Sequence, residues 1–174
     1  MMCCINRVRS VLEKLPNSKT CFVCGDQNPS GLKVRFWADG DTVFTRFTPR
    51  LEQMGYHGVT HGGVMAALLD ETMGWAPSLV NRRFCVSIEL NVQYLKPLPI
   101  GLEVTVSGKA GAGNRRIWEA EGEIKDSDGV VYARGKGRYV AISDAKTREV
   151  VSYLQFDGET VSPERIFRAS DLSD

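Results

Sequence analysis

Residues 61–71, His-Gly-Gly-Val-Met-Ala-Ala-Leu-Leu-Asp-Glu, decide the fold and the chemistry that we expect of this chain. A His-Gly-Gly turn opens an apolar segment with helical spacing, and Asp70 lies in the middle of that segment. Glycines let the backbone approach a ligand closely. The first turn of a helix offers unpaired N–H donors and a partial positive charge. The turn is therefore suited to bind an oxygen atom that gains negative charge. A carboxylate inside an apolar helix is unusual, which indicates that Asp70 has a specific role.

Asp70 lies on a strip of small side chains along the predicted helix. Its neighbours one turn away are Ala66, Ala67 and Gly74. Small side chains leave room beside the carboxylate for a ligand and a water molecule. Glu71 points about 100° further around the helix, next to Leu68 and Trp75, which indicates a packing face or a subunit contact. We therefore choose Asp70 as the reactive acid.

The remainder of the chain predicts mainly strands. Alternating apolar and polar residues predict strands over 32–37, 42–47, 84–95, 102–110, 115–126 and 129–142. The one long helix between them, over 63–76, has apolar residues around its whole circumference, so we expect it to be buried on most sides. One buried helix followed by an antiparallel meander indicates an α+β fold.

The two ends of the chain are expected to differ from this central domain. Helical spacing of apolar residues predicts an extra N-terminal helix over 5–15, which Pro16 ends. We expect an N-terminal helical extension (1–20), a main domain (21–156) and a polar C-terminal tail (157–174) that frays after about residue 156.

The segment 61–71 resembles the active-site segment of the hotdog-fold acyl-CoA thioesterases, in particular their PaaI-like branch, in which Asp follows the His of HGG by nine positions. The likeness continues in GYHGVT (55–60), ETMGWA (71–76), VSIELNVQYLKPLPIG (86–101), GKGRYV (135–140) and CFVCGDQNPSGL (21–32). It spans roughly residues 21–142. The resemblance implies a hotdog fold, in which an antiparallel sheet of five to six strands wraps a long central helix. It also implies hydrolysis of an acyl-CoA thioester, with coenzyme A as part of the substrate and no separate cofactor.

The resemblance and the helix chemistry together suggest roles for individual residues. We expect the Gly62 N–H to bind the thioester carbonyl oxygen. Asp70 is expected to act as general base or as nucleophile, with a pKa raised by partial burial. Ser87 occupies the place where related enzymes position the water, and Asn91 is expected further along the same strand face. His61 is expected to hold the loop and to cap the helix beside Gly63.

The spacing along the helix also predicts an assembly. Gly62 and Asp70 lie eight residues apart, which is about 12 Å at about 1.5 Å per residue. One chain cannot easily bring both groups to one thioester, whereas two antiparallel helices of a twofold dimer can. The resemblance implies this arrangement, so we expect an obligate homodimer that stacks as a dimer of dimers.

Coenzyme A carries phosphates, for which basic residues at strand ends are natural partners. The candidates are Arg115, Arg116, Lys136 and Arg138, although any one of them could instead be an ordinary solvated charge on a strand. Some relatives hold the carbonyl with Asn or Gln upstream of HGG, where this chain has Gly55. His57 or Tyr56 could supply the second oxyanion contact, or these residues could only line the loop.

Composition narrows the class of protein. The chain has 174 residues, with 22 Lys and Arg against 21 Asp and Glu. This balance gives no support for a nucleic-acid-binding face. Without a long apolar run or an apolar signal core, we expect no membrane span and a cytoplasmic location.

The five cysteines, an odd number, argue against a disulfide framework. Cys21 and Cys24 have zinc-knuckle spacing, but a tetrahedral site needs two further ligands, which Cys3 and Cys4 could supply. We expect buried or loop thiols and no metal.

Two alternatives to the hydrolase stay open. One is a non-catalytic hotdog module that binds acyl-CoA as a sensor or scaffold. The other is a hotdog dehydratase or hydratase, although these typically pair His with Asp in a different motif.

Overall fold

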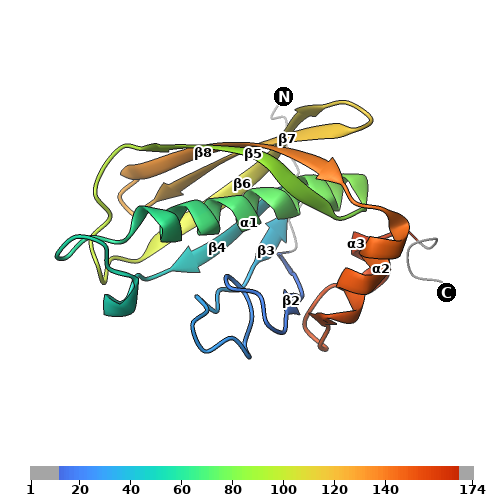
Figure 1. Cartoon of the computed structure of the whole chain (residues 1–174), viewed down its shortest axis with the longest axis horizontal. Coiled ribbons are helices and arrows are strands. Elements are labelled where there is room, and N and C mark those ends of the chain that lie inside the picture. Colours follow the sequence, from blue (N-terminus) through green and yellow to red (C-terminus); the bar gives the residue numbers. More distant parts are fainter. Residues whose placement is uncertain (1–11, 169–174) are drawn as a thin grey trace, which may run out of the picture.

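The computed structural model describes residues 12–168, and its long helix lies across one face of an antiparallel sheet (Figure 1). The seven strands of this sheet are, in spatial order, β1 (Glu13–Lys14), β3 (Trp37–Asp39), β4 (Thr42–Phe47), β6 (Val104–Gly113), β7 (Ile117–Lys125), β8 (Val131–Ala141) and β5 (Cys85–Tyr94). A second sheet pairs β2 (Asn17–Ser18) with β9 (Leu154–Gln155). The helices are α1 (Gly62–Asn81), α2 (Asp144–Ser152) and α3 (Pro163–Ile166), preceded by the 3-10 turn η1 (Leu51–Gln53). The predicted α+β class is confirmed, although the described sheet has seven strands rather than five or six.

Helix α1 begins where the sequence predicts and runs five residues further. His61 caps it, because its Nδ1 accepts a hydrogen bond of 2.9 Å from the Gly63 N–H. Pro77 lies inside the helix and removes one backbone donor. The Ser78 hydroxyl donates to the Gly74 carbonyl at 2.8 Å in the same turn. The helix ends at Arg82, which adopts a left-handed conformation with φ of 52°.

A row of glycines lets α1 pack closely on the sheet. Gly108, Gly122 and Gly135 face one another across β6, β7 and β8. A Cβ atom at Gly108 would lie 2.7 Å from the Thr72 carbonyl oxygen and 2.8 Å from the Met73 Cα. Side chains at these positions would push the helix away from the sheet. The glycines therefore set the short distance between α1 and the sheet.

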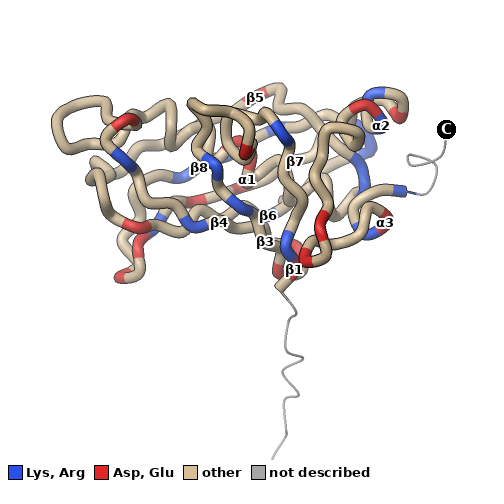
Figure 2. Tube along the Cα trace, turned by 90° about the horizontal axis from the view of Figure 1, so that it is seen from below, with Lys and Arg blue, Asp and Glu red and all other residues tan. Residues whose placement is uncertain are grey.

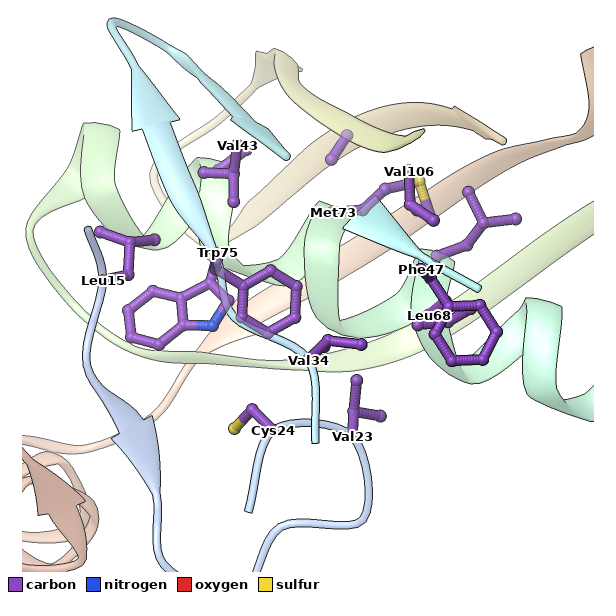
Figure 3. Packing of buried hydrophobic residues seen from close by; sticks show 14 of the residues in the cluster. Leu15, Val23, Cys24, Val34, Val43, Phe47, Leu68, Met73, Trp75 and Val106 are labelled. Carbon is purple, nitrogen blue, oxygen red and sulfur yellow. The ribbon is translucent and has the colours of Figure 1, made fainter. Parts of the chain in front are cut away.

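The core lies between α1 and the sheet, and the segment 32–36 completes one border of it. Figure 3 shows Val34 beside Val23 and Cys24 at this border. The predicted strand over 32–37 is wrong except at Trp37, because Lys33 has a φ of 58° and breaks the extended backbone. The amides of Leu32 and Val34 instead donate to carbonyls of the loop at residues 22–23. The other five predicted strands are confirmed within three residues at each end.

Both ends of the chain differ from the sequence predictions. Within the described part of the expected helix over 5–15, Glu13–Lys14 forms β1 and pairs with β3, so the chain is extended there. Residues 5–11 lie outside the described residues. At the other end, the expectation that the chain frays after residue 156 is wrong for 157–168. Ile166 and Phe167 are fully buried, and the rings of Phe167 and Phe84 lie 4.8 Å apart.

Charges of both signs are interspersed along the described chain (Figure 2). Among the helices of residues 12–168, none combines the length and the apolar character that a membrane crossing requires.

Candidate active site

Asp70 faces a cavity of about 340 Å³ between α1, the start of β5 and the loop after β2. Its Oδ2 accepts a long hydrogen bond of 3.5 Å from the Ser87 hydroxyl. Its Oδ1 is buried and has no hydrogen-bond partner among the residues that the structure describes. Buried carboxylate oxygens are normally paired, so this atom is free to accept a bond from a molecule in the cavity.

Burial raises the pKa of the Asp70 carboxyl, and the hydrogen bond from Ser87 partly opposes this. None of the described residues that line the cavity is Lys, Arg or His. Trp75, Phe84 and Val86 supply apolar parts of the wall. A carboxylate without a counter-charge in such surroundings has the character of a base.

Gly62 occupies the first position of α1, directly after the capping His61. Within the described part of the chain its N–H has no acceptor. Its carbonyl accepts a hydrogen bond of 2.9 Å from the Tyr94 hydroxyl, and a Cβ atom at this position would lie 3.3 Å from the Tyr94 ring. Gly62 lines two surface hollows of about 350 Å³ and 380 Å³, and Tyr56 lines both as well. The N–H donor is therefore available at the surface beside Tyr94, a residue that the sequence interpretation missed.

Among residues 12–168, the hollows that Gly62 borders are separate from the cavity that Asp70 borders. Gly62 borders the hollows at the start of α1, whereas Asp70 borders the cavity near its middle. One protomer alone therefore does not bring the two groups together.

A β-bulge separates Ser87 from Asn91. In the pairing of β5 with β8, Ser87 lies opposite Tyr139 and Glu89 lies opposite Arg138, so Ile88 is an extra residue. A one-residue shift moves the side chains that follow to the other face of the sheet. The prediction that Asn91 lies on the same face as Ser87 is therefore wrong.

The bulge also explains why Tyr94 faces α1. Without it, Tyr94 would share a face with Val86, away from Ser87. With it, Ser87 and Tyr94 both point towards the helix, one near Asp70 and the other at Gly62. The apolar alternation through residues 84–94 continues across the bulge, so the sequence carries no signal of it.

The predicted basic residues lie away from the Asp70 cavity. Lys136 pairs with Glu121 at 2.8 Å, and Arg138 pairs with Glu89 at 2.9 Å. Arg115 and Arg116 are exposed in the turn between β6 and β7. The cavity is lined by none of the four.

Of the residues considered for the second oxyanion contact, Tyr56 borders the Gly62 hollows and His57 does not. Both side chains are exposed. Gly55 packs closely against the capping residue His61. A Cβ atom at Gly55 would lie 3.1 Å from the His61 Cα, so a larger side chain there would crowd His61.

Glu71 meets two cysteines at the wall of the same cavity. The Cys21 thiol donates a hydrogen bond of 2.9 Å to the Glu71 carboxylate, and Cys24 lies beside them. Burial raises the pKa of Glu71 to about 8. Glu71 therefore does more than pack against Leu68 and Trp75, as its helix position had suggested.

The comparisons with known proteins point to one superfamily. Residues 57–133 match the model of the thioesterase superfamily. This matched segment contains Gly62, Asp70 and Ser87, and the chain as a whole has the hotdog fold. A protein of Saccharolobus solfataricus named as a candidate esterase, SSO2140, is 34% identical over 83 residues. That match covers 47% of this chain and 59% of the relative, so it spans less than two thirds of the relative's length.

Solved structures of this superfamily have the same fold. The thioesterase superfamily protein RHA08564 is 26% identical with a TM-score of 0.65, over 70% of this chain and 63% of that one. The PaaI protein of Escherichia coli, from the phenylacetic acid degradation operon, is 18% identical with a TM-score of 0.60. This match covers 64% of our chain and 81% of the PaaI chain. A Streptococcus mutans protein solved with bound acetyl CoA is 17% identical with a TM-score of 0.55. This match covers 59% of our chain and 82% of the Streptococcus mutans chain. At the identities of the last two, the likeness shows the fold alone.

Proposed function

We propose that this protein hydrolyses an acyl-CoA thioester to the free acid and coenzyme A, with Asp70 of one subunit and the Gly62 N–H of another at each site. The observation that carries the proposal is the Asp70 carboxylate, which faces a cavity with one buried oxygen unpaired among the described residues. A thioester hydrolase needs such a base next to a water molecule, whereas a module that only binds acyl-CoA has no need of a buried acid.

In this mechanism Asp70 takes a proton from a water molecule that the Ser87 hydroxyl helps to position. The water oxygen forms a bond to the thioester carbon, and the carbonyl oxygen gains the negative charge. The Gly62 N–H donates to that oxygen, where the positive end of the α1 dipole favours the charge. The tetrahedral intermediate then breaks its carbon–sulfur bond, and the leaving thiolate of coenzyme A takes up the proton that Asp70 holds, which restores the carboxylate. Direct attack by the Asp70 carboxylate is the alternative that uses the same groups.

The edge of the sheet offers a surface for the dimer that this mechanism needs. Strand β5 is an edge strand ten residues long, paired on one side with β8. Val86 and Ile88 on this edge are 50% and 52% exposed. Long apolar edges are normally covered. Pairing of two copies of β5 would place two α1 helices antiparallel and side by side, so that Gly62 of one chain could approach Asp70 of the other.

The CoA-bound structure of the Streptococcus mutans protein supports a coenzyme A thioester as the substrate class. The exposed Arg115, Arg116, Lys136 and Arg138 remain our candidates for the phosphates of coenzyme A. We also propose the cytoplasm as the location, because the described cysteines, Cys21, Cys24 and Cys85, form no disulfide.

Thiol release from a panel of short, medium, long and aromatic acyl-CoA esters tests the proposal. We expect turnover of at least one ester, and a loss of about 10²-fold or more in kcat for Asp70→Asn. The matched control is Asp39→Asn, a change of the same type at an exposed position of β3, which should leave kcat unchanged. Tight acyl-CoA binding without release would identify the non-catalytic module instead. Hydration of an enoyl-CoA without thiol release would identify the hydratase.

A further inference from the structure

Three metal-ligating side chains from two distant parts of the chain meet at the wall of the Asp70 cavity. The Sγ atoms of Cys21 and Cys24 and a carboxylate oxygen of Glu71 all lie within 4.8 Å of one another. The cysteines lie in the loop after β2, and Glu71 lies near the middle of α1. In a tetrahedral zinc site, bonds of about 2.3 Å to sulfur and about 2.1 Å to oxygen place the ligand atoms about 3.6–3.8 Å apart. Small rotations of the side chains therefore bring the three atoms to a common centre.

The loop that carries the cysteines is shaped to hold charged sulfur atoms. The Val23 N–H donates to the Cys21 Sγ at 3.2 Å, and the Ser18 N–H donates to the Cys24 Sγ at 3.4 Å. Such donors support the sulfur ligands of a metal site. The chain then closes tightly, because a Cβ atom at Gly25 would lie 2.5 Å from the Cys21 backbone nitrogen. The geometry is that of a Cys-x-x-Cys-Gly knuckle with its two sulfur atoms turned to Glu71.

The surroundings of the cluster also favour a bound cation. The described lining of the cavity includes Asp70, Glu71 and three cysteines, and it includes no basic side chain. Cys24 is 2% exposed. Carboxylates and thiolates gathered in apolar surroundings stay charged only where a positive charge compensates them. A divalent ion supplies that compensation from within the cluster.

We propose that Cys21, Cys24 and Glu71 bind a zinc ion whose fourth coordination position is open to the cavity that holds Asp70. Two sulfur ligands and one oxygen ligand favour zinc over harder ions such as Mg²⁺ and Ca²⁺. Three protein ligands with one open position is the arrangement of zinc sites that bind a water molecule or another ligand. The ion ties the loop at 21–25 to α1. The proposal replaces the sequence expectation of thiols without a metal.

Metal analysis of the full chain tests this site independently of any hydrolase activity. Protein purified with reductant and without chelator should contain about one zinc ion per chain. Cys21→Ser and Cys24→Ser should lose the zinc, and Glu71→Gln should retain it more weakly in competition with a chromogenic chelator. The matched control is Cys85→Ser, because Cys85 lines the same cavity but contacts the Ser78 hydroxyl at 3.3 Å instead of the cluster. That variant should keep its zinc.

Cobalt substitution tests the geometry even where a cysteine variant fails to fold. The wild-type protein loaded with Co²⁺ should show the d–d bands of tetrahedral cobalt and a sulfur-to-cobalt charge-transfer band. When a small thiol is added and binds at the open position, the d–d bands should shift. Wild-type protein that binds neither zinc nor cobalt, or a Cys21–Cys24 disulfide in the purified chain, would overturn the proposal. Zinc loss in a Cys3→Ser/Cys4→Ser variant would overturn the open fourth position.

Discussion

Replacing Gly62 with proline removes one N–H donor from the start of α1 and little else. Proline is well tolerated at the first position of a helix, where the N–H has no intrahelical partner. The preceding His61 has φ of −62° and ψ of 132°, an extended conformation that suits a residue before proline. The matched variant is Gly62→Ala, which keeps the N–H. In both variants the new Cβ atom lies 3.3 Å from the Tyr94 ring, so the steric cost of that contact is shared.

The comparison of these two variants isolates the oxyanion donor. Loss of one such donor lowers kcat by about 10²–10³-fold, or about 2.7–4 kcal/mol. We therefore expect Gly62→Pro to turn over its best acyl-CoA ester about 10²–10³ times more slowly than Gly62→Ala. Thiol release gives the rates, and Tm and the mass of the assembly check the fold. A proline variant as fast as the alanine variant, with unchanged Tm and mass, would refute the role of the Gly62 N–H.

Three further changes test how the structure supports this site. Tyr94→Phe removes the 2.9 Å hydrogen bond to the Gly62 carbonyl, and it should reduce kcat by up to about tenfold with little change in Tm; an unchanged kcat would show that Tyr94 does not orient this peptide. Gly108→Ala puts a Cβ atom 2.8 Å from the Met73 Cα and should lower the free energy of unfolding in urea by about 1–3 kcal/mol. Its control is Gly158→Ala, where nothing lies within 4 Å, and equal stability of the two variants would contradict the close packing of α1. Phe167→Ala removes a fully buried ring and should cost about 3–5 kcal/mol in the same assay; no loss would mean that the segment after α2 lies outside the core.

The sequence predicted the parts of the molecule that follow local rules. Helix α1 was predictable from its apolar periodicity, and its start at His61 was predictable because a capping side chain acts within three residues. The strands of the meander follow from alternation and hairpin turns. The place of Asp70 on a strip of small residues follows from helix geometry alone. For these features the local pattern and the tertiary structure agree.

The remaining features depend on contacts between distant residues. The bulge at Ile88 leaves the apolar alternation of β5 unbroken, so the pattern gave no reason to separate Asn91 from Ser87. The meeting of Cys21 with Glu71 joins residues 50 positions apart and depends on how the loop folds over α1. The burial of Phe167 rests on tertiary contacts with Phe84, and a short apolar pair in a polar tail shows no periodicity.

The central claim, that each site combines two subunits, is tested most directly by mixing two inactive variants. Chains with Asp70→Asn and chains with Gly62→Pro are co-expressed with different tags, and thiol release is compared with that of each variant alone. In a mixed dimer one site combines the intact Gly62 of the first chain with the intact Asp70 of the second. Random pairing should therefore restore about one quarter of the wild-type activity per chain. Activity no higher than that of the separate variants, with mixed dimers verified by their tags, would contradict a site shared between subunits.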